Sequence, residues 1–114
     1  MKENPDRALR CAEVRQAGTC AGYLQELPEG GCRFTYLEDY TGAPVSLTLP
    51  VRREPYVFAG FPPVFDGLLP EGPQLEALLR THKIDRSDAF AQLVTVGADL
   101  VGSLSVRLVE GAAI

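Results

Sequence analysis

The stretch that divides this chain is Pro63-Val64-Phe65-Asp66-Gly67-Leu68-Leu69-Pro70-Glu71-Gly72. Proline restricts its own φ and disfavours helix at the residue before it, while glycine permits φ > 0. Leu68 and Leu69 are therefore expected in a short element, about one helical turn long, between breakers on both sides. Strand patterns precede this stretch and helix patterns follow it. It is either a structural corner or a rigid loop that displays side chains.

Alternation of apolar and polar residues before the dividing stretch predicts four strands. The clearest alternation runs over residues 45–49, and a similar one over 32–36. Weaker patterns over 10–17 and 19–25 complete the set. Residues 50–63 are expected to form a loop, because Pro55, Pro62 and Pro63 interrupt them.

Helical spacing follows the dividing stretch. It predicts a first helix with one apolar face, formed by Leu75, Leu78, Leu79 and His82. A second helix is predicted from an N-cap at Asp85 or Ser87 to a C-cap at Gly97. Renewed alternation over 104–108 predicts a last strand.

These elements predict an α+β fold, with a mainly antiparallel sheet of about five strands and two short helices packed on it. We expect one domain over residues 10–109, between a flexible N-terminus at 1–9 and a flexible tail at 110–114, because the 114 residues match the size of a single domain. No apolar run is long enough to span a membrane, and the first ten residues do not resemble a signal peptide. We therefore expect a cytoplasmic protein without membrane contact.

The composition argues against direct binding of nucleic acid. The formal net charge is −4 at pH 7, and the adjacent basic pair Arg52-Arg53 is followed at once by Glu54. Binding to a phosphate backbone needs clustered lysine or arginine. No nucleic-acid partner is therefore expected.

The residues with chemical potential form no catalytic pattern. The chain has no glycine-rich nucleotide-binding motif and no kinase catalytic loop. Cys11, Cys20 and Cys32 lack C-x-x-C spacing, and His82 is the single histidine. We expect no catalytic residue, no metal and no cofactor. Capping or solvation is the simpler role for the carboxylates of Asp66 and Glu71.

Several motifs follow one another in a fixed order. They are Val45-Ser46-Leu47-Thr48-Leu49-Pro50, Pro55-Tyr56, Phe65-Asp66-Gly67-Leu68-Leu69-Pro70-Glu71-Gly72, Lys83-Ile84-Asp85 and Gly102-Ser103-Leu104-Ser105-Val106. In this order they resemble the N-terminal subdomain of HipA-like serine/threonine kinases of bacterial toxin–antitoxin systems. The resemblance covers roughly residues 10–108.

The resemblance implies a function in binding. Full-length HipA proteins continue into a kinase core, and this chain ends where that core would begin. Gly67 stands where long HipA proteins usually have asparagine, which is more similar to the stand-alone HipS-like form. In that arrangement a HipT-like kinase is a separate polypeptide, and a HipB-like helix-turn-helix DNA-binding protein is a third component. The resemblance therefore implies a non-catalytic antitoxin that binds and neutralises a HipT/HipA-type kinase toxin.

Other interpretations remain open. The chain is alternatively a structural N-lobe subunit of a split HipA kinase toxin, supporting its activity or the docking of HipB, or an excised domain of a larger enzyme. Some stand-alone members carry a bulky aromatic residue after Pro-Glu-Gly, where this chain has Pro73 and Gln74. That departure argues against an aromatic-plug mechanism.

Partner-binding residues are expected on and beside the dividing stretch, at Phe58, Phe61, Phe65, Asp66, Leu68 and Glu71. Exposed aromatic side chains make good interface anchors, and loops on a rigid scaffold are common functional sites. Two roles are open for Phe65 and Leu69: they close the core or they anchor an interface. As the alternative to capping or solvation, Asp66 and Glu71 face the partner and pair with basic groups of a kinase's phosphate-binding site.

Overall fold

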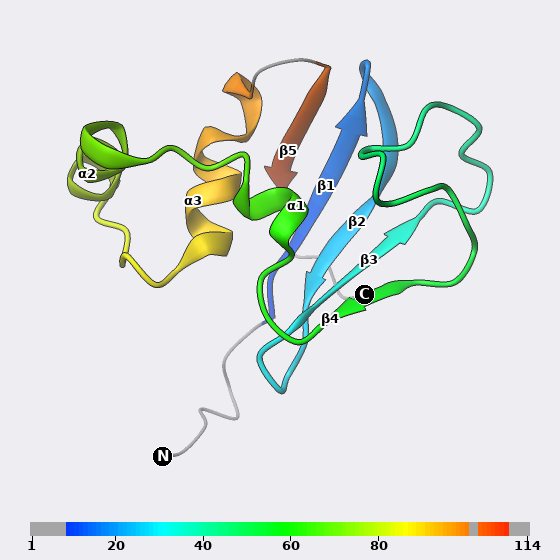
Figure 1. The fold of residues 1–114 in the computed structure, drawn as a ribbon, viewed down its shortest axis with the longest axis horizontal. Helices are drawn as coiled ribbons and strands as arrows, with labels where there is room; N and C mark the ends of the chain where they lie inside the picture. Colours follow the sequence, from blue (N-terminus) through cyan, green and yellow to red (C-terminus); the bar gives the residue numbers. More distant parts are fainter. Residues whose placement is uncertain (1–8, 101–102, 110–114) are drawn as a thin grey trace.

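The computed structural model describes residues 9–100 and 103–109 (Figure 1). The expected flexible ends, residues 1–9 and 110–114, lie outside the described residues apart from Leu9. In chain order the elements are β1 (Cys11–Gln16), β2 (Thr19–Glu26), β3 (Cys32–Tyr36), β4 (Tyr56–Phe58), α1 (Pro63–Asp66), α2 (Gly72–His82), α3 (Ala89–Val96), the 3₁₀ helix η1 (Gly97–Asp99) and β5 (Leu104–Leu108). None of the described helices has the length and apolarity needed to cross a membrane.

The strands form one antiparallel sheet in the order β4-β3-β2-β1-β5. Strands β1, β2 and β3 follow one another as hairpins, while β5 returns from the helices to pair with β1. The predicted α+β fold with a mainly antiparallel sheet is confirmed.

Two predictions about the strands are wrong. Residues 45–49 are no strand: Leu49 N–H donates to the carbonyl of Ser46, which closes a tight turn. A strand occurs instead at Tyr56–Phe58, where a loop was expected, because these three residues pair with Cys32–Phe34 of β3. Alternation over so few residues cannot distinguish a strand from a turn that buries both of its ends.

One face of the sheet is apolar and carries the core. Val14, Leu24 and Phe34 are fully buried there. Helix α3 covers part of this face and buries Phe90 and Leu93. It ends at Gly97, where any Cβ would lie 1.7 Å from the carbonyl oxygen of Val106, so only glycine permits this close approach of α3 to β5. Figure 1 shows α1 and α3 against the sheet and α2 at the edge of the molecule, and α2 fully buries no side chain.

The opposite face of the sheet carries a buried carboxylate. Glu13 accepts hydrogen bonds from Arg107 at 2.8 Å and from Arg15 at 3.1 Å. Burial raises the pKa of Glu13, but hydrogen bonds from Cys20 and Arg107 and the two positive charges outweigh it, so the net pKa is lowered. The ionised form of Glu13 is therefore part of the folded state.

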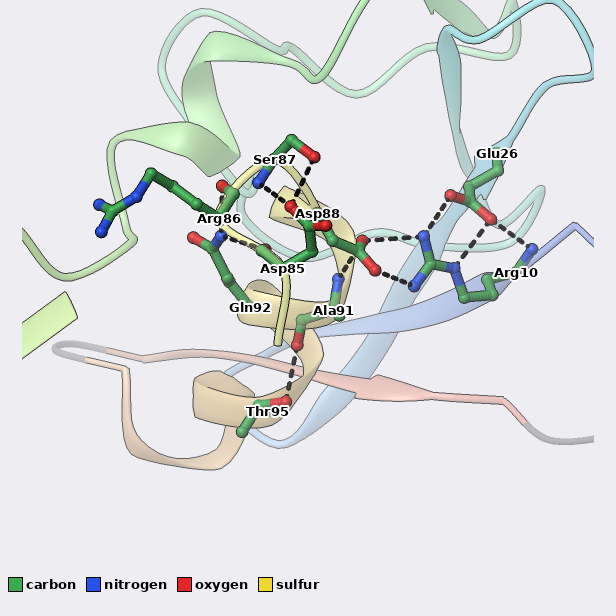
Figure 2. Close-up of polar contacts among 9 residues, drawn as sticks. All are labelled: Arg10, Glu26, Asp85, Arg86, Ser87, Asp88, Ala91, Gln92 and Thr95. Carbon is green, nitrogen blue, oxygen red and sulfur yellow. Dashed lines mark hydrogen bonds and ion pairs between the residues drawn. The ribbon is translucent and has the colours of Figure 1, made fainter. Parts of the chain in front are cut away.

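A second polar cluster ties α3 to the sheet (Figure 2). The side chain of Arg10 donates two hydrogen bonds to Glu26, at 2.7 and 2.9 Å, and two to Asp88, at 2.9 and 3.1 Å. Asp88 also accepts from Ala91 N–H and so is the N-cap of α3, which corrects the predicted cap at Asp85 or Ser87. The guanidinium lies 5.0 Å from the ring centre of Phe90. Hydrogen bonding to Glu26 and Asp88 raises the pKa of Arg10, although burial opposes the shift.

Replacing Arg10 should loosen the attachment of α3. We expect Arg10→Ala to lower the free energy of unfolding by about 1–3 kcal/mol, since two half-buried carboxylates lose a charged partner. The control is Arg53→Ala, because the Arg53–Glu38 pair is largely exposed and should contribute less than about 1 kcal/mol. Urea unfolding of both variants measures the difference; equal losses would contradict the role given to Arg10.

Because the pKa of Glu13 is lowered, the contribution of this residue to stability should depend on pH. A carboxyl with a lowered folded-state pKa stabilises the protein above its ordinary pKa, and this contribution is lost as the pH falls through the folded-state pKa. The stability gap between the wild type and Glu13→Gln should therefore be large at about pH 7 and shrink toward about pH 3. Urea unfolding at both pH values measures it, with Glu38→Gln in the exposed pair as the control. A gap that does not change with pH would contradict the assignment.

Candidate functional site

The dividing stretch forms one helical turn followed by a loop. Helix α1 starts at Pro63, a favoured first helical residue, and the carbonyl of Pro62 accepts the N–H groups of Phe65 and Asp66. Leu68 and Leu69 follow the helix in a further turn, with N–H bonds to the carbonyls of Phe65 and Asp66. The short helical element is confirmed, although it ends just before the two leucines expected in it.

Buried side chains anchor the stretch to the core. Phe65 is fully buried, and its ring centre lies 5.9 Å from that of Phe34 in β3. Pro62 is also fully buried, and Leu68 and Leu69 are half-buried against the core. Of the two roles open for Phe65, this structure supports the core anchor, because Phe65 offers no surface to a partner.

The two carboxylates of the stretch face solvent. Asp66, on α1, and Glu71, at the N-cap of α2, are both exposed. Neither carboxylate has a hydrogen bond or ion pair within residues 9–100 and 103–109. Gly67 between them has an ordinary right-handed φ of −66°, and an added Cβ would lie 3.6 Å from the nearest atom, so the backbone does not require glycine here. The result is a rigid base that carries two unpaired negative charges.

The two remaining predicted aromatics lie apart from these carboxylates. Phe58 is half-buried on the edge strand β4. Phe61 is half-buried beside Arg10 and Phe90, where the three side chains help to line a small hollow. The predicted residues therefore do not form one cluster: Asp66, Leu68 and Glu71 share the stretch, while Phe58 and Phe61 precede it.

An open hollow beside the stretch, lined by both polar and apolar side chains, was not predicted. Leu68, Leu69 and Pro70 line it together with Leu78 and His82 of α2. Gln74, Thr95, Val96 and Leu100 complete the lining, and the volume is about 440 Å³. The helical spacing of the leucines on α2 was the available signal, but it predicts only that a face is apolar. The structure leaves Leu75, Leu78 and Leu79 half-buried.

In the described part of the chain, no group of three or more His, Cys, Asp or Glu residues could hold a metal ion. Cys11, Cys20 and Cys32 are free thiols. Burial raises the pKa of Cys11 and that of Cys32, the latter to about 11. Such thiols stay protonated near neutral pH and are poor nucleophiles.

Known proteins share both the sequence pattern and the fold of this chain. The family model described as "HipA N-terminal domain" matches residues 12–107. A solved structure titled "N-terminal domain of HipA toxin" superposes with a TM-score of 0.71 at 28% identity, covering 98% of this chain and 100% of that one.

Two curated relatives differ in length. An "Uncharacterized protein" of Haemophilus influenzae is 31% identical over 99 residues, which is 87% of this chain and 92% of that protein. A protein of Sinorhizobium fredii named "Putative kinase Y4mE" is 30% identical over 102 residues, which is 86% of this chain but only 24% of that protein. The domain thus forms nearly all of one relative and a quarter of another. By its matching residues and its fold, this chain belongs to the HipA N-terminal domain family.

Proposed function

We propose that this chain is a non-catalytic, antitoxin-like protein that binds a separate HipT/HipA-type serine/threonine kinase and neutralises it. The observation that carries the proposal is the dividing stretch, which is anchored by Phe65 and displays the unpaired carboxylates of Asp66 and Glu71. A rigid display loses little conformational entropy when it binds.

Charge complementarity supports a kinase as the partner. The phosphate-binding region of a kinase concentrates positive groups, because it must hold the negative charges of a nucleotide triphosphate. Exposed carboxylates on a rigid turn can bind such groups through charge-assisted hydrogen bonds. A protein that occupies this region competes with the nucleotide, and inhibition follows.

The family membership supports the same class of partner. The rhizobial relative, in which the matching domain is a quarter of a longer protein, is named as a kinase. The Haemophilus relative consists almost entirely of this domain. In this proposal the chain supplies as a separate protein the contact that the longer relative makes within one polypeptide. A HipB-like DNA-binding protein is a third component of the proposed complex.

The longer relative also favours a second candidate function. If the domain is a working part of that kinase, the present chain is a structural N-lobe subunit that supports the activity of a split kinase or the docking of a HipB-like protein. The two functions predict opposite effects on phosphorylation.

The decisive experiment adds the purified chain to the HipA-type kinase core of the same organism. At an equimolar ratio we expect phosphorylation of the kinase's target to fall, because the chain occupies the nucleotide region. A rise in activity would favour the structural subunit. Unchanged activity would contradict both inhibition and support of the kinase activity.

Charge reversal tests the residues. We expect Asp66→Arg combined with Glu71→Arg to weaken binding at least about tenfold, equivalent to ~1.4 kcal/mol, without unfolding the domain. The matched control is Glu29→Arg combined with Asp39→Arg, which makes the same change in net charge at exposed loop positions elsewhere. Calorimetric titration with the kinase measures both affinities. Equal weakening by the two variants would mean that only net charge matters.

A further inference from the structure

Residues 45–49 form a turn that displays a leucine. Leu49 N–H donates to the carbonyl of Ser46 at 3.0 Å, and Thr48 N–H donates to Ser46 Oγ at 3.2 Å. The ends of the turn point inward, since Val45 is 8% and Leu49 is 3% exposed. Leu47, at the tip, is 95% exposed and is the most exposed large apolar side chain in the described part of the chain.

The turn is tied to the core by a buried tyrosine. The Tyr36 hydroxyl accepts a hydrogen bond from Val45 N–H at 3.0 Å and donates one to the carbonyl of Leu49. One phenol therefore holds both ends of the turn. The ring of Tyr40 stacks on Tyr36, with 5.8 Å between ring centres, and the Tyr40 hydroxyl donates to the carbonyl of Ala43. Leu47 is consequently presented on a fixed backbone.

Single exposed apolar side chains are common and need no explanation by themselves. What distinguishes Leu47 is the polar network built beneath it. A preorganised anchor loses little conformational freedom on binding, so its apolar surface contributes more fully to affinity. A leucine held in this way has the properties of an interface anchor.

The turn shares its support with the dividing stretch. The ring centres of Tyr36 and Phe34 are 4.9 Å apart, and those of Phe34 and Phe65 are 5.9 Å apart. Tyr36 holds the turn, and Phe65 belongs to α1. The turn and the dividing stretch therefore rest on one row of packed rings, on the same face of the sheet. The two segments are therefore supported by the same buried rings.

We propose that Leu47 is a second anchor for the kinase, inserting into an apolar pocket on the surface of that partner. This inference rests on the proposed function and adds to it a contact that is apolar where the first is charged. The charged contact of Asp66 and Glu71 weakens as salt screens it, whereas burial of a leucine does not depend on screening. The two contacts should therefore separate when the ionic strength is changed.

The test compares three variants in titrations with the kinase. Burial of a leucine side chain corresponds to about 10–100-fold in Kd, and we expect Leu47→Ser to weaken binding by that factor at both low and high salt. Leu47→Met should restore most of the affinity, because it keeps an apolar side chain of similar volume. The matched control is Val57→Ser: Val57 is 68% exposed and points to the opposite face of the sheet, since Tyr56 and Phe58 pack on the core. It should change Kd by less than about twofold.

A buried variant tests the support beneath the turn. Tyr36→Phe removes the hydroxyl but keeps the ring, so Leu47 loses its fixed backbone while its side chain is untouched. We expect a partial loss of affinity in this variant, and the double variant with Leu47→Ser should bind about as weakly as Leu47→Ser alone, because the two changes act on one contact. Urea unfolding of each variant determines whether the domain remains folded at the temperature of the titration.

Several outcomes would overturn the proposal. If Leu47→Ser binds within about twofold of wild type while the Asp66/Glu71 variant is weakened, the proposed function stands and Leu47 is no anchor. If the unmodified chain does not bind the kinase, the proposed function and the role of Leu47 are both wrong. If sedimentation shows self-association that Leu47→Ser abolishes, the turn contacts a second copy of this chain instead.

Discussion

The proposed binding surface depends on the ring of Phe34. Phe34 lies in β3, between β2 and β4, and is fully buried on the apolar face, where its ring packs against those of Tyr36 and Phe65. The helices of this domain are short, and α2 buries nothing completely. Irregular segments must therefore cover much of the apolar sheet, and they do so by inserting rings and aliphatic side chains. The loops of this protein are part of its core layer.

This way of covering a sheet produces rigid loops. A segment that only connects two elements is free to move, whereas short α1, which buries Phe65, and the turn that buries Val45 and Leu49 are fixed by those contacts. Residues adjacent to such anchors are then forced outward with defined directions. Asp66 and Leu47 are both one or two residues from a buried side chain, and both are exposed. Exposed residues on such fixed supports suit the preorganised contacts of the proposed binding function.

Much of the fold could be predicted from the residues alone. The strands at Cys11–Gln16, Thr19–Glu26 and Cys32–Tyr36 were predicted within a residue or so, as was the helix ending at His82. Alternation was the signal for these strands, but 32–36 is no longer than 45–49, so pattern length alone does not separate the correct predictions from the wrong one. The pattern at 45–49 failed because a tight turn and a strand both place its first and last residues inward, and they differ only at Leu47. The residues expected in the site also differ in where they lie. Asp66 and Glu71 are exposed, as a binding role requires, whereas Phe65 is buried in the core.

By itself the sequence determined the elements whose causes are local: alternation, helical spacing, proline breaks and the family pattern of the dividing stretch. These depend on residues a few positions apart, so they can be seen along the chain. Only the tertiary structure decided that Phe65 is covered, that Leu47 is not, and that the turn and the stretch share one support. Burial depends on which distant segments cover a side chain, and Tyr36 joins Val45 and Leu49 through a hydroxyl whose partners no local pattern specifies.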